Sequence, residues 1–285
     1  MIISIASGKG GTGKTTLATN LAVAIKREGV QLLDCDVEEP NAHLFLKPTL
    51  TNSIQISTEV PQIDTKLCTF CGLCQEICQF NAIAILPQVA LEFPELCHSC
   101  GGCFLVCPES AVKSNERELG TVETGFYDSV EFVHGRLRVG EAMAPPLIRR
   151  VRKEINKDKV VIIDAPPGTS CPVIASLKDA DFVVLVTEPT PFGLNDLELA
   201  VGAVRKLRIP MGIVVNRADL GDDRVHKFAD SEAIPILLEI PFEREVAEAY
   251  AKGELLVERL PGWQERLELL FENIKLQVSK QRARP

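Results

Sequence analysis

Eight of the ten cysteines in this 285-residue chain occur in two copies of one spacing, C-x2-C-x2-C-x3-C. The first copy contains Cys68, Cys71, Cys74 and Cys78, and the second contains Cys97, Cys100, Cys103 and Cys107. Closely spaced thiolates can hold one face of an iron–sulfur cube, while the fourth thiolate, after a longer step, reaches a neighbouring cluster. The spacing therefore predicts two 4Fe–4S clusters.

The repeat extends beyond these cysteines, because apolar and glycine positions also align. Leu67, Gly72, Ile77, Ala82 and Ile83 match Leu96, Gly101, Val106, Ala111 and Val112. The segment resembles a bacterial-type ferredoxin in which each half is a loop, a short helix and a strand. The resemblance implies crossed ligands: Cys68, Cys71, Cys74 and Cys107 hold one cluster, and Cys97, Cys100, Cys103 and Cys78 hold the other.

Pro108 follows its cysteine as this motif expects, whereas Gln79 replaces the matching proline in the first copy. Zinc and disulfides are the alternatives. Structural zinc prefers two separated cysteine pairs, and the chain shows no secretory signal that would indicate an oxidising compartment. Both alternatives are therefore weaker than the cluster interpretation.

A second chemical motif, G-x-x-x-x-G-K-T, follows an apolar strand expected at residues 2–6. Backbone N–H groups of such a loop surround a phosphate, Lys14 meets the β and γ oxygens, and the Thr15 hydroxyl reaches magnesium. A helix is expected from Lys14 to Glu28. The residues predicted to bind ATP or ADP here are Gly8, Gly10, Gly11, Thr12, Gly13, Lys14, Thr15 and Thr16.

Lys9, after the first glycine, makes the motif more specific: G-K-G-G-x-G-K-T-T. This resembles the deviant Walker A motif of the MinD, ParA, Mrp and nitrogenase iron-protein superfamily. The resemblance implies that Lys9 crosses a homodimer interface, formed on ATP binding, to the partner's nucleotide. The alternative is a solvated loop lysine.

Two expected strands end in carboxylates, residues 31–35 with Asp34-Cys35-Asp36 and residues 160–164 with Asp164. By the same resemblance, Asp36 positions the attacking water. Asp164 is the Walker B carboxylate, and Thr15, Asp36 and Asp164 hold Mg²⁺ directly or through water. Lys9, Lys14, Asp36 and Asp164 are thus the candidate catalytic residues, and Gly168 presents its amide to the γ-phosphate.

Later strands are expected at 182–186, 213–215 and 236–239. Asn216 and Arg217 follow the second of these, and Pro241 and Phe242 follow the third. In the superfamily these positions bind the base, so Asn216 is expected to read the adenine edge and Pro241-Phe242 to line its pocket. An asparagine that closes a strand is also a common turn residue.

The alternation of these elements predicts an α/β fold, a doubly wound, mainly parallel P-loop sheet with an inserted small α+β ferredoxin domain. Residues 1–63 and 116–285 would form the discontinuous ATPase domain, and residues 64–115 the insert. Segments 53–63 and 130–139 alternate in polarity, which predicts a hairpin-like stem between the two domains.

The net charge of −8 and the pI near 5.2 argue against a nucleic-acid partner. Leu267, Leu270, Phe271, Ile274 and Val278 form a stripe at helical spacing, which we assign to core packing rather than to membrane binding. The basic tail at 280–284 is expected to be a solvated end. We expect a cytoplasmic protein.

Two cysteines lie outside the repeats. Cys35, in an expected buried strand, is assigned to the core. Cys171 lies at the spacing from Asp164 where nitrogenase iron-protein relatives place a ligand of a bridging cluster, so it is either an interface thiol or a redox or metal contact.

The predicted function is coupling of ATP binding and hydrolysis to electron transfer through the two clusters, toward a redox partner protein. The alternative is an ATP-dependent iron–sulfur or metal-cluster carrier that serves an acceptor protein. A third possibility, a MinD-like spatial organiser, has the least support.

Overall fold

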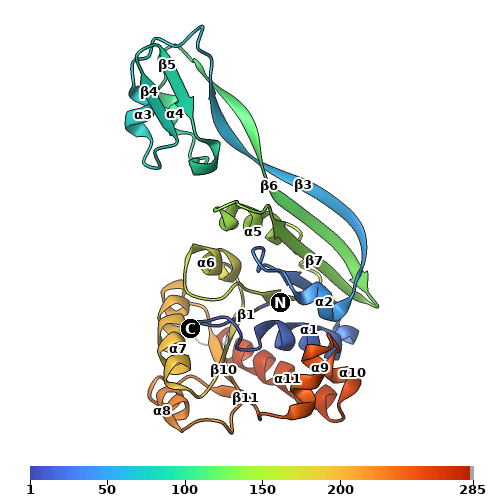
Figure 1. The fold of residues 1–285 in the computed structure, drawn as a ribbon. Helices are drawn as coiled ribbons and strands as arrows, with labels where there is room; N and C mark the ends of the chain where they lie inside the picture. Colours follow the sequence, from blue (N-terminus) through green and yellow to red (C-terminus); the bar gives the residue numbers. More distant parts are fainter. Residues whose placement is uncertain (283–285) are drawn as a thin grey trace. The chain divides into compact units, whose positions relative to one another are not determined.

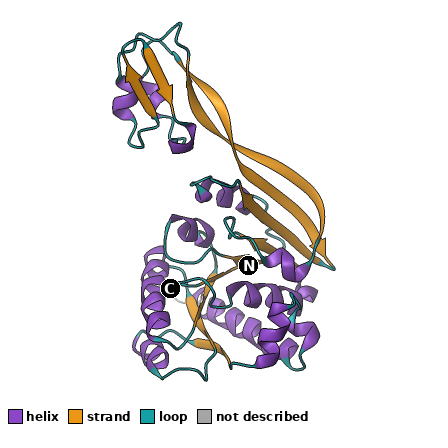
Figure 2. Cartoon of the chain, viewed as in Figure 1, coloured by secondary structure: helices purple, strands orange, loops and turns teal. Residues whose placement is uncertain are grey.

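The computed structural model describes residues 1–282 of the chain and divides it into two compact units (Figures 1 and 2). Unit 1 consists of residues 1–53, 122–136 and 148 onward, and unit 2 of residues 54–121 and 137–147. Unit 2 contains more residues than the segment 64–115 expected from the sequence. It also includes parts of two long strands and the segment 137–147. The domain assignment itself stays a proposal.

Within the described residues, one sheet contains nine strands in the order β11-β10-β9-β1-β8-β2-β7-β6-β3. The pairings from β11 through to β7 are all parallel. The strands are β1 (Ile2–Ala6), β2 (Val30–Asp34), β3 (Thr49–Ile63), β6 (Val112–Tyr127), β7 (Val130–Leu137), β8 (Val160–Asp164), β9 (Phe182–Thr187), β10 (Met211–Asn216) and β11 (Ile236–Ile240). This order confirms the predicted α/β fold with a large, mainly parallel sheet.

Helices of unit 1 cover both faces of the sheet (Figure 1). They are α1 (Lys14–Ala24), α2 (Ala42–Leu46), α6 (Cys171–Leu177), α7 (Pro191–Leu207), α8 (Arg224–Ser231), α9 (Arg244–Ala251), α10 (Leu256–Arg259) and α11 (Trp263–Arg282), with the short 3-10 helix η1 (Lys26–Glu28) after α1. Helix α5 (Ala144–Arg152) begins in unit 2 and ends in unit 1. The predicted helix from Lys14 to Glu28 is therefore two elements.

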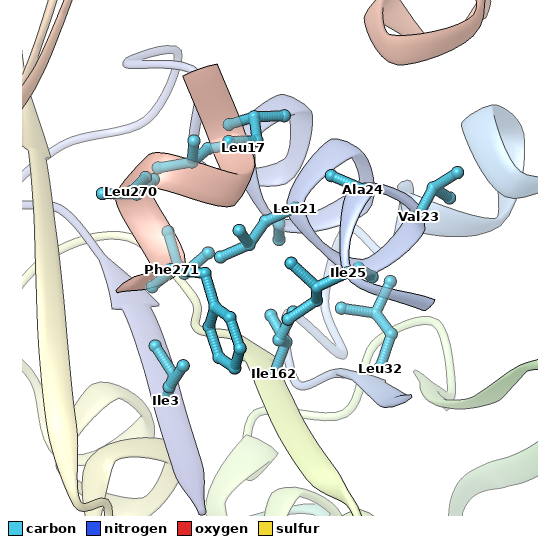
Figure 3. Close-up of a cluster of buried hydrophobic side chains, with 14 of the residues drawn as sticks. Ile3, Leu17, Leu21, Val23, Ala24, Ile25, Leu32, Ile162, Leu270 and Phe271 are labelled. Carbon is cyan, nitrogen blue, oxygen red and sulfur yellow. The ribbon is translucent and has the colours of Figure 1, made fainter. Parts of the chain in front are cut away.

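Strand β9 shows how the two faces are filled. Phe182 and Val184 belong to the core under α1 and α11, whereas Val183 and Leu185 belong to the core under α6, α7 and α8. Successive side chains of a strand point to opposite faces, so a continuous apolar run is needed where both faces are covered. Figure 3 shows the first core, in which α1 and α11 meet.

The α11 stripe lies in this core, since Leu267, Leu270, Phe271, Ile274 and Val278 are all buried. The assignment of the stripe to core packing is thus confirmed. Among residues 1–282, no helix combines the length and apolar character that crossing a bilayer requires. The predicted solvated tail at 280–284 lies partly outside the described residues.

The stem differs from the sequence prediction. Strand β3 neighbours β6, at 112–127, and both strands run from one unit into the other. The strand predicted at 130–139 is present as β7, residues 130–137, but its predicted place as the second stem strand is wrong, because it pairs in parallel with β2. Residues 113–118 are polar and show no alternation, so the sequence analysis did not predict β6, the strand that lies beside β3.

The two cysteine-containing copies in unit 2 also share their backbone conformation. Each copy has a short helix, α3 (Leu73–Ile77) and α4 (Gly102–Val106), that begins after a left-handed glycine, Gly72 and Gly101. Positive φ angles recur at Phe70 and Ser99 and again at Asn81 and Ser110. A hairpin of β4 (Ile83–Leu86) and β5 (Val89–Glu92) and the 3-10 helix η2 (Pro94–Leu96) connect the copies.

Candidate functional site

The loop between β1 and α1 borders a cavity of about 450 Å³ in unit 1. Gly11 and Gly13 adopt positive φ angles of 77° and 97°, which glycine tolerates without strain. Helix α1 begins without a side-chain cap at Gly13. Its first amides can therefore serve an anion such as a phosphate.

The cavity wall contains most of the predicted nucleotide residues. Gly10, Gly11, Gly13, Lys14, Thr15, Thr16, Asp36, Asn216, Arg217, Pro241 and Phe242 all line it. Among the described residues, Gly8, Lys9, Thr12, Asp164 and Gly168 are not part of this wall. Its volume falls in the range of small-molecule sites.

Lys14 lies among three carboxylates. Burial lowers its pKa, while Asp164, Asp36 and Asp34 act in the opposite direction. Burial raises the pKa of Asp164 to about 7, opposed by the nearby Thr15 hydroxyl and Lys14, and raises the pKa of Asp36 to about 6. A cation in this site would favour the ionised carboxylates.

One further observation indicates that the residues of this site could bind a magnesium ion. Asp164 is fully buried, and neither of its carboxylate oxygens has a close hydrogen-bond partner in the described residues. Buried charged oxygens are normally paired or bind a metal. Thr15, Asp36 and Asp164 therefore form a suitable oxygen-ligand set.

Asp34 has a role that the sequence analysis missed. Its Oδ1 accepts the Asp36 amide at 3.0 Å, and its Oδ2 accepts the Asn41 and Ala42 amides at 3.1 and 3.0 Å. Burial raises its pKa well above the usual value, and the Asp164 charge adds to this. Asp34 thus holds the loop that carries Asp36. The only sequence signal was an aspartate ahead of a short helix.

Lys9 lies beside a buried glutamate. Its Nζ is 3.4 Å from Oε2 of Glu188, the residue after β9. The other oxygen of Glu188 lies 3.0 Å from Nη1 of Arg217. Lys9 is therefore paired within its own chain in this structure, a contact that the motif did not indicate.

The end of β10 joins the predicted base pocket to the phosphate loop. Asn216 Nδ2 donates to the Thr12 carbonyl at 2.9 Å, and the Arg217 guanidinium lies 5.8 Å from the Phe242 ring centre. The Phe242 amide donates to Asp219 Oδ1 at 2.6 Å. Asp219, which the sequence analysis did not single out, thus fixes the segment that carries Phe242.

Residues 3–257 match the family model described as the CobQ/CobB/MinD/ParA nucleotide binding domain. The chain belongs to this family. Its P-loop, the strand-end carboxylates and the parallel sheet are consistent with nucleotide binding at the cavity. The sequence resemblance to MinD- and ParA-type proteins is confirmed at this level.

Relatives of this CobQ/CobB/MinD/ParA member include an uncharacterised protein of Methanocaldococcus jannaschii, 33% identical over 96% of each chain. An iron–sulfur cluster carrier protein of Aquifex aeolicus is 28% identical, over 90% of this chain and 61% of the relative. Among solved structures, the septum site-determining protein MinD of Pyrococcus horikoshii, in complex with Mg-ADP, has a TM-score of 0.61 and 22% identity, covering 100% of this chain and 99% of that one. The last likeness shows the fold alone.

The segment after β8 contains Gly168, which has a positive φ of 96°. Its amide donates to the Ser7 carbonyl at 2.9 Å. The amide would have to leave this partner to reach a γ-phosphate. Its predicted role in this nucleotide-binding domain therefore requires a local rearrangement.

In unit 2 the eight repeat cysteines gather in two small cavities. One is lined by Cys68, Cys71, Cys74 and Cys107, and the other by Cys78, Cys97, Cys100 and Cys103. Each cavity combines three cysteines of one copy with the last cysteine of the other. These are the two sets that the crossed assignment groups together.

The surroundings of the sulfurs fit iron–sulfur clusters. Backbone amides of Phe70, Ala82, Ser99 and Ala111 donate to the sulfurs of Cys68, Cys78, Cys97 and Cys107 at 3.2–3.4 Å. Such bonds stabilise cluster-ligating thiolates and tune the reduction potential.

The remaining cysteines differ in exposure. Cys35 is fully buried, as predicted for a core residue, and burial raises the pKa of its thiol. Cys171 is exposed at the first position of α6. Its role as an interface thiol or a metal contact stays open.

Proposed function

We propose that this protein is a dimeric ATPase that couples its nucleotide cycle to electron transfer through two 4Fe–4S clusters. The observation that carries this proposal is the gathering of eight cysteines into two four-sulfur cavities, in a chain that also has a nucleotide-binding domain. Residues 64–115 would be the ferredoxin insert. A soluble redox protein would be its partner in the cytoplasm.

In the nucleotide site, Lys14 binds the β and γ oxygens of ATP and Asp36 orients the attacking water. Thr15, Asp36 and Asp164 would hold magnesium directly or through water, and the bound ion would neutralise charge on the phosphates. Asn216, Arg217, Pro241 and Phe242 surround the base. On closure of the dimer, Lys9 leaves Glu188 and stabilises charge on the partner's nucleotide.

In unit 2, Cys68, Cys71, Cys74 and Cys107 hold one cluster, and Cys97, Cys100, Cys103 and Cys78 hold the other. Each cluster supplies one-electron redox chemistry when bound. The backbone amides at the sulfurs stabilise the thiolates.

A second candidate function is delivery of iron–sulfur clusters to an acceptor protein. It is favoured by the Aquifex aeolicus relative, which is named an iron–sulfur cluster carrier protein. Burial does not separate the two candidate functions, because each set has one buried cysteine, Cys74 or Cys97, and one exposed cysteine, Cys71 or Cys100. The two functions differ in whether the clusters leave the protein.

Iron and sulfide analysis with low-temperature spin resonance of anaerobically purified protein tests the proposal. We expect two 4Fe–4S clusters per chain that are reduced and reoxidised without loss of iron. Zinc in place of iron would contradict both candidate functions. Transfer of both clusters to an apo-acceptor in the presence of ATP would favour the carrier.

A further inference from the structure

A buried carboxylate at the end of β9 has two cationic partners. Glu188, directly after β9, is only 7% exposed. Its Oε2 lies 3.4 Å from Nζ of Lys9 in the phosphate loop, and its Oε1 lies 3.0 Å from Nη1 of Arg217 after β10. All three residues belong to unit 1. Glu188 therefore joins the phosphate loop to the end of β10.

Close packing fixes the backbone that carries this carboxylate. The Thr190 amide donates to the Glu188 carbonyl at 2.8 Å. A Cβ added at Gly193 of α7 would overlap this carbonyl oxygen, and one added at Gly221 would overlap the carbonyl oxygen of the next residue, Pro189. Helix α7 and the loop after β10 thus hold the turn from two sides.

The two cations are not held equally. The Arg217 amide donates to Oδ1 of Asn216 at 3.0 Å, and the Arg217 guanidinium lies near the Phe242 ring as well as Glu188. Lys9 has the longer of the two contacts with Glu188, and attraction between charges falls with distance. Lys9 is therefore the cation that leaves the carboxylate more readily.

Arg217 also changes the free energy of that step. When Lys9 leaves while Arg217 stays, the buried carboxylate of Glu188 keeps one cationic partner. Without Arg217, the same step leaves a buried charge unpaired, which is strongly unfavourable. The guanidinium thus makes the departure of Lys9 easier.

We propose that Glu188 is a positioning residue that holds Lys9 within its own chain and so opposes closure of the dimer, and that Arg217 weakens this hold. The inference rests on the proposed function, in which Lys9 reaches the partner's nucleotide. Phosphate charge must then outcompete the Glu188 carboxylate for the Lys9 ammonium. The strength of the contact with Glu188 sets the nucleotide concentration at which the dimer closes.

The first test measures the hold on Lys9 in the nucleotide-free chain, as the rate at which an acetylating reagent labels this side chain. Peptide mass spectrometry gives the rate. Glu188→Gln keeps the shape of the side chain but removes its charge, so Lys9 should be labelled faster than in wild type. Arg217→Gln should slow the labelling, because Lys9 loses its competitor for Glu188. The double variant should be labelled as fast as Glu188→Gln alone.

Glu198→Gln and Arg224→Gln are the matched controls for these two substitutions. Each removes the same charge from an exposed residue, Glu198 in α7 or Arg224 at the start of α8. Neither should change the labelling of Lys9. Equal labelling rates in wild type and Glu188→Gln would overturn the inference, whether or not the protein forms a dimer.

The second test is light scattering during titration with a non-hydrolysable ATP analogue and magnesium. Glu188→Gln should close the dimer at a concentration about two- to fivefold lower than wild type, the effect of a partly exposed ion pair. In the Arg217→Gln background the same substitution should have a larger effect, because Lys9 is held more firmly there. Closure of Glu188→Gln at the wild-type concentration or above would overturn the inference.

A direct effect of the Glu188 charge on nucleotide binding is separated in the Lys9→Ala background. There, Glu188→Gln should leave the affinity for the analogue unchanged, because the lysine that it holds is absent. A rise in affinity by the same factor as the shift in closure would overturn the inference. Absence of a dimer in every variant would contradict the proposed function, while the labelling rates would still show whether Glu188 holds Lys9.

Discussion

Asp164 shows how burial at one residue sets a pH dependence. Its folded pKa, about 7, lies above the usual 3.8, so the folded chain binds this proton more tightly than the unfolded chain. The contribution to stability is therefore present below pH 3.8 and is lost as the pH rises to about 7. Asp164→Asn cannot ionise, so it should raise the melting temperature of nucleotide-free, metal-free protein above pH 7.

This difference should disappear near pH 4, where the wild-type carboxyl is protonated as well. Asp222→Asn is the control: Asp222 is exposed, and its hydrogen bonds with Arg224 lower its pKa, so its replacement should give no stabilisation at high pH. A melting temperature of Asp164→Asn below wild type at every pH would contradict the assignment.

Asp34 carries a stability prediction of its own. Asp34→Ala leaves three backbone amides, of Asp36, Asn41 and Ala42, without their acceptor. Each buried unsatisfied donor costs about 1–3 kcal/mol, so urea unfolding should show a loss of at least this size. Glu38→Ala, an exposed change in the same loop, should have little effect. Equal stability of the two variants would contradict the role of Asp34.

For single residues, the sequence predicts a function where the residue belongs to a short, local motif. The phosphate loop, the strand-end carboxylates and the cysteine spacing can all be read directly, because each depends on a few consecutive positions. Glu188 and Asp219 were missed as partners, because their contacts join segments far apart in the chain, and Asp34 was missed because it accepts the amides of an irregular loop that no motif describes. No periodic pattern marks such pairs.

Among the elements, the phosphate loop packs very closely on α7. A Cβ added at Gly8 would lie 2.1 Å from the Asp196 carbonyl oxygen, whereas one at Gly10 would meet nothing within 4 Å. Gly8→Ala should therefore destabilise the nucleotide-free chain by about 1–3 kcal/mol, the usual cost of overpacking. Gly10→Ala should unfold like wild type in thermal or urea denaturation. If Gly10→Ala were less stable than Gly8→Ala, the loop and α7 would not be in close contact.

Strands could be predicted from the sequence where burial requires a clear pattern of apolar residues. Strands β8 and β9 are continuous apolar runs, since helices cover both faces of the sheet there. Strand β6 was missed because residues 113–116 are polar and exposed, so no alternation shows. Pairing with a neighbouring strand, rather than a buried face, makes these residues a strand.

For the whole molecule, we expect ATP with magnesium to drive dimerisation. Lys9→Ala should fail to close the dimer, because it lacks the ammonium that we propose to reach the partner's nucleotide. Asp36→Ala should bind ATP without hydrolysing it and accumulate as the closed dimer. Light scattering measures both. An unchanged monomer for both variants at saturating ATP would count against the role assigned to Lys9.

The exchange of Cys78 and Cys107 between the repeats has a consequence for symmetry. The two copies share positive-φ positions and cap glycines, and each gives its last cysteine to the cavity of the other. Neither copy alone supplies a complete set of four thiols. Two separate chains of a single copy, paired face to face, would build the same two sites, each chain donating its last cysteine to the other. The repeat segment of unit 2 thus corresponds to two such copies joined end to end in one chain.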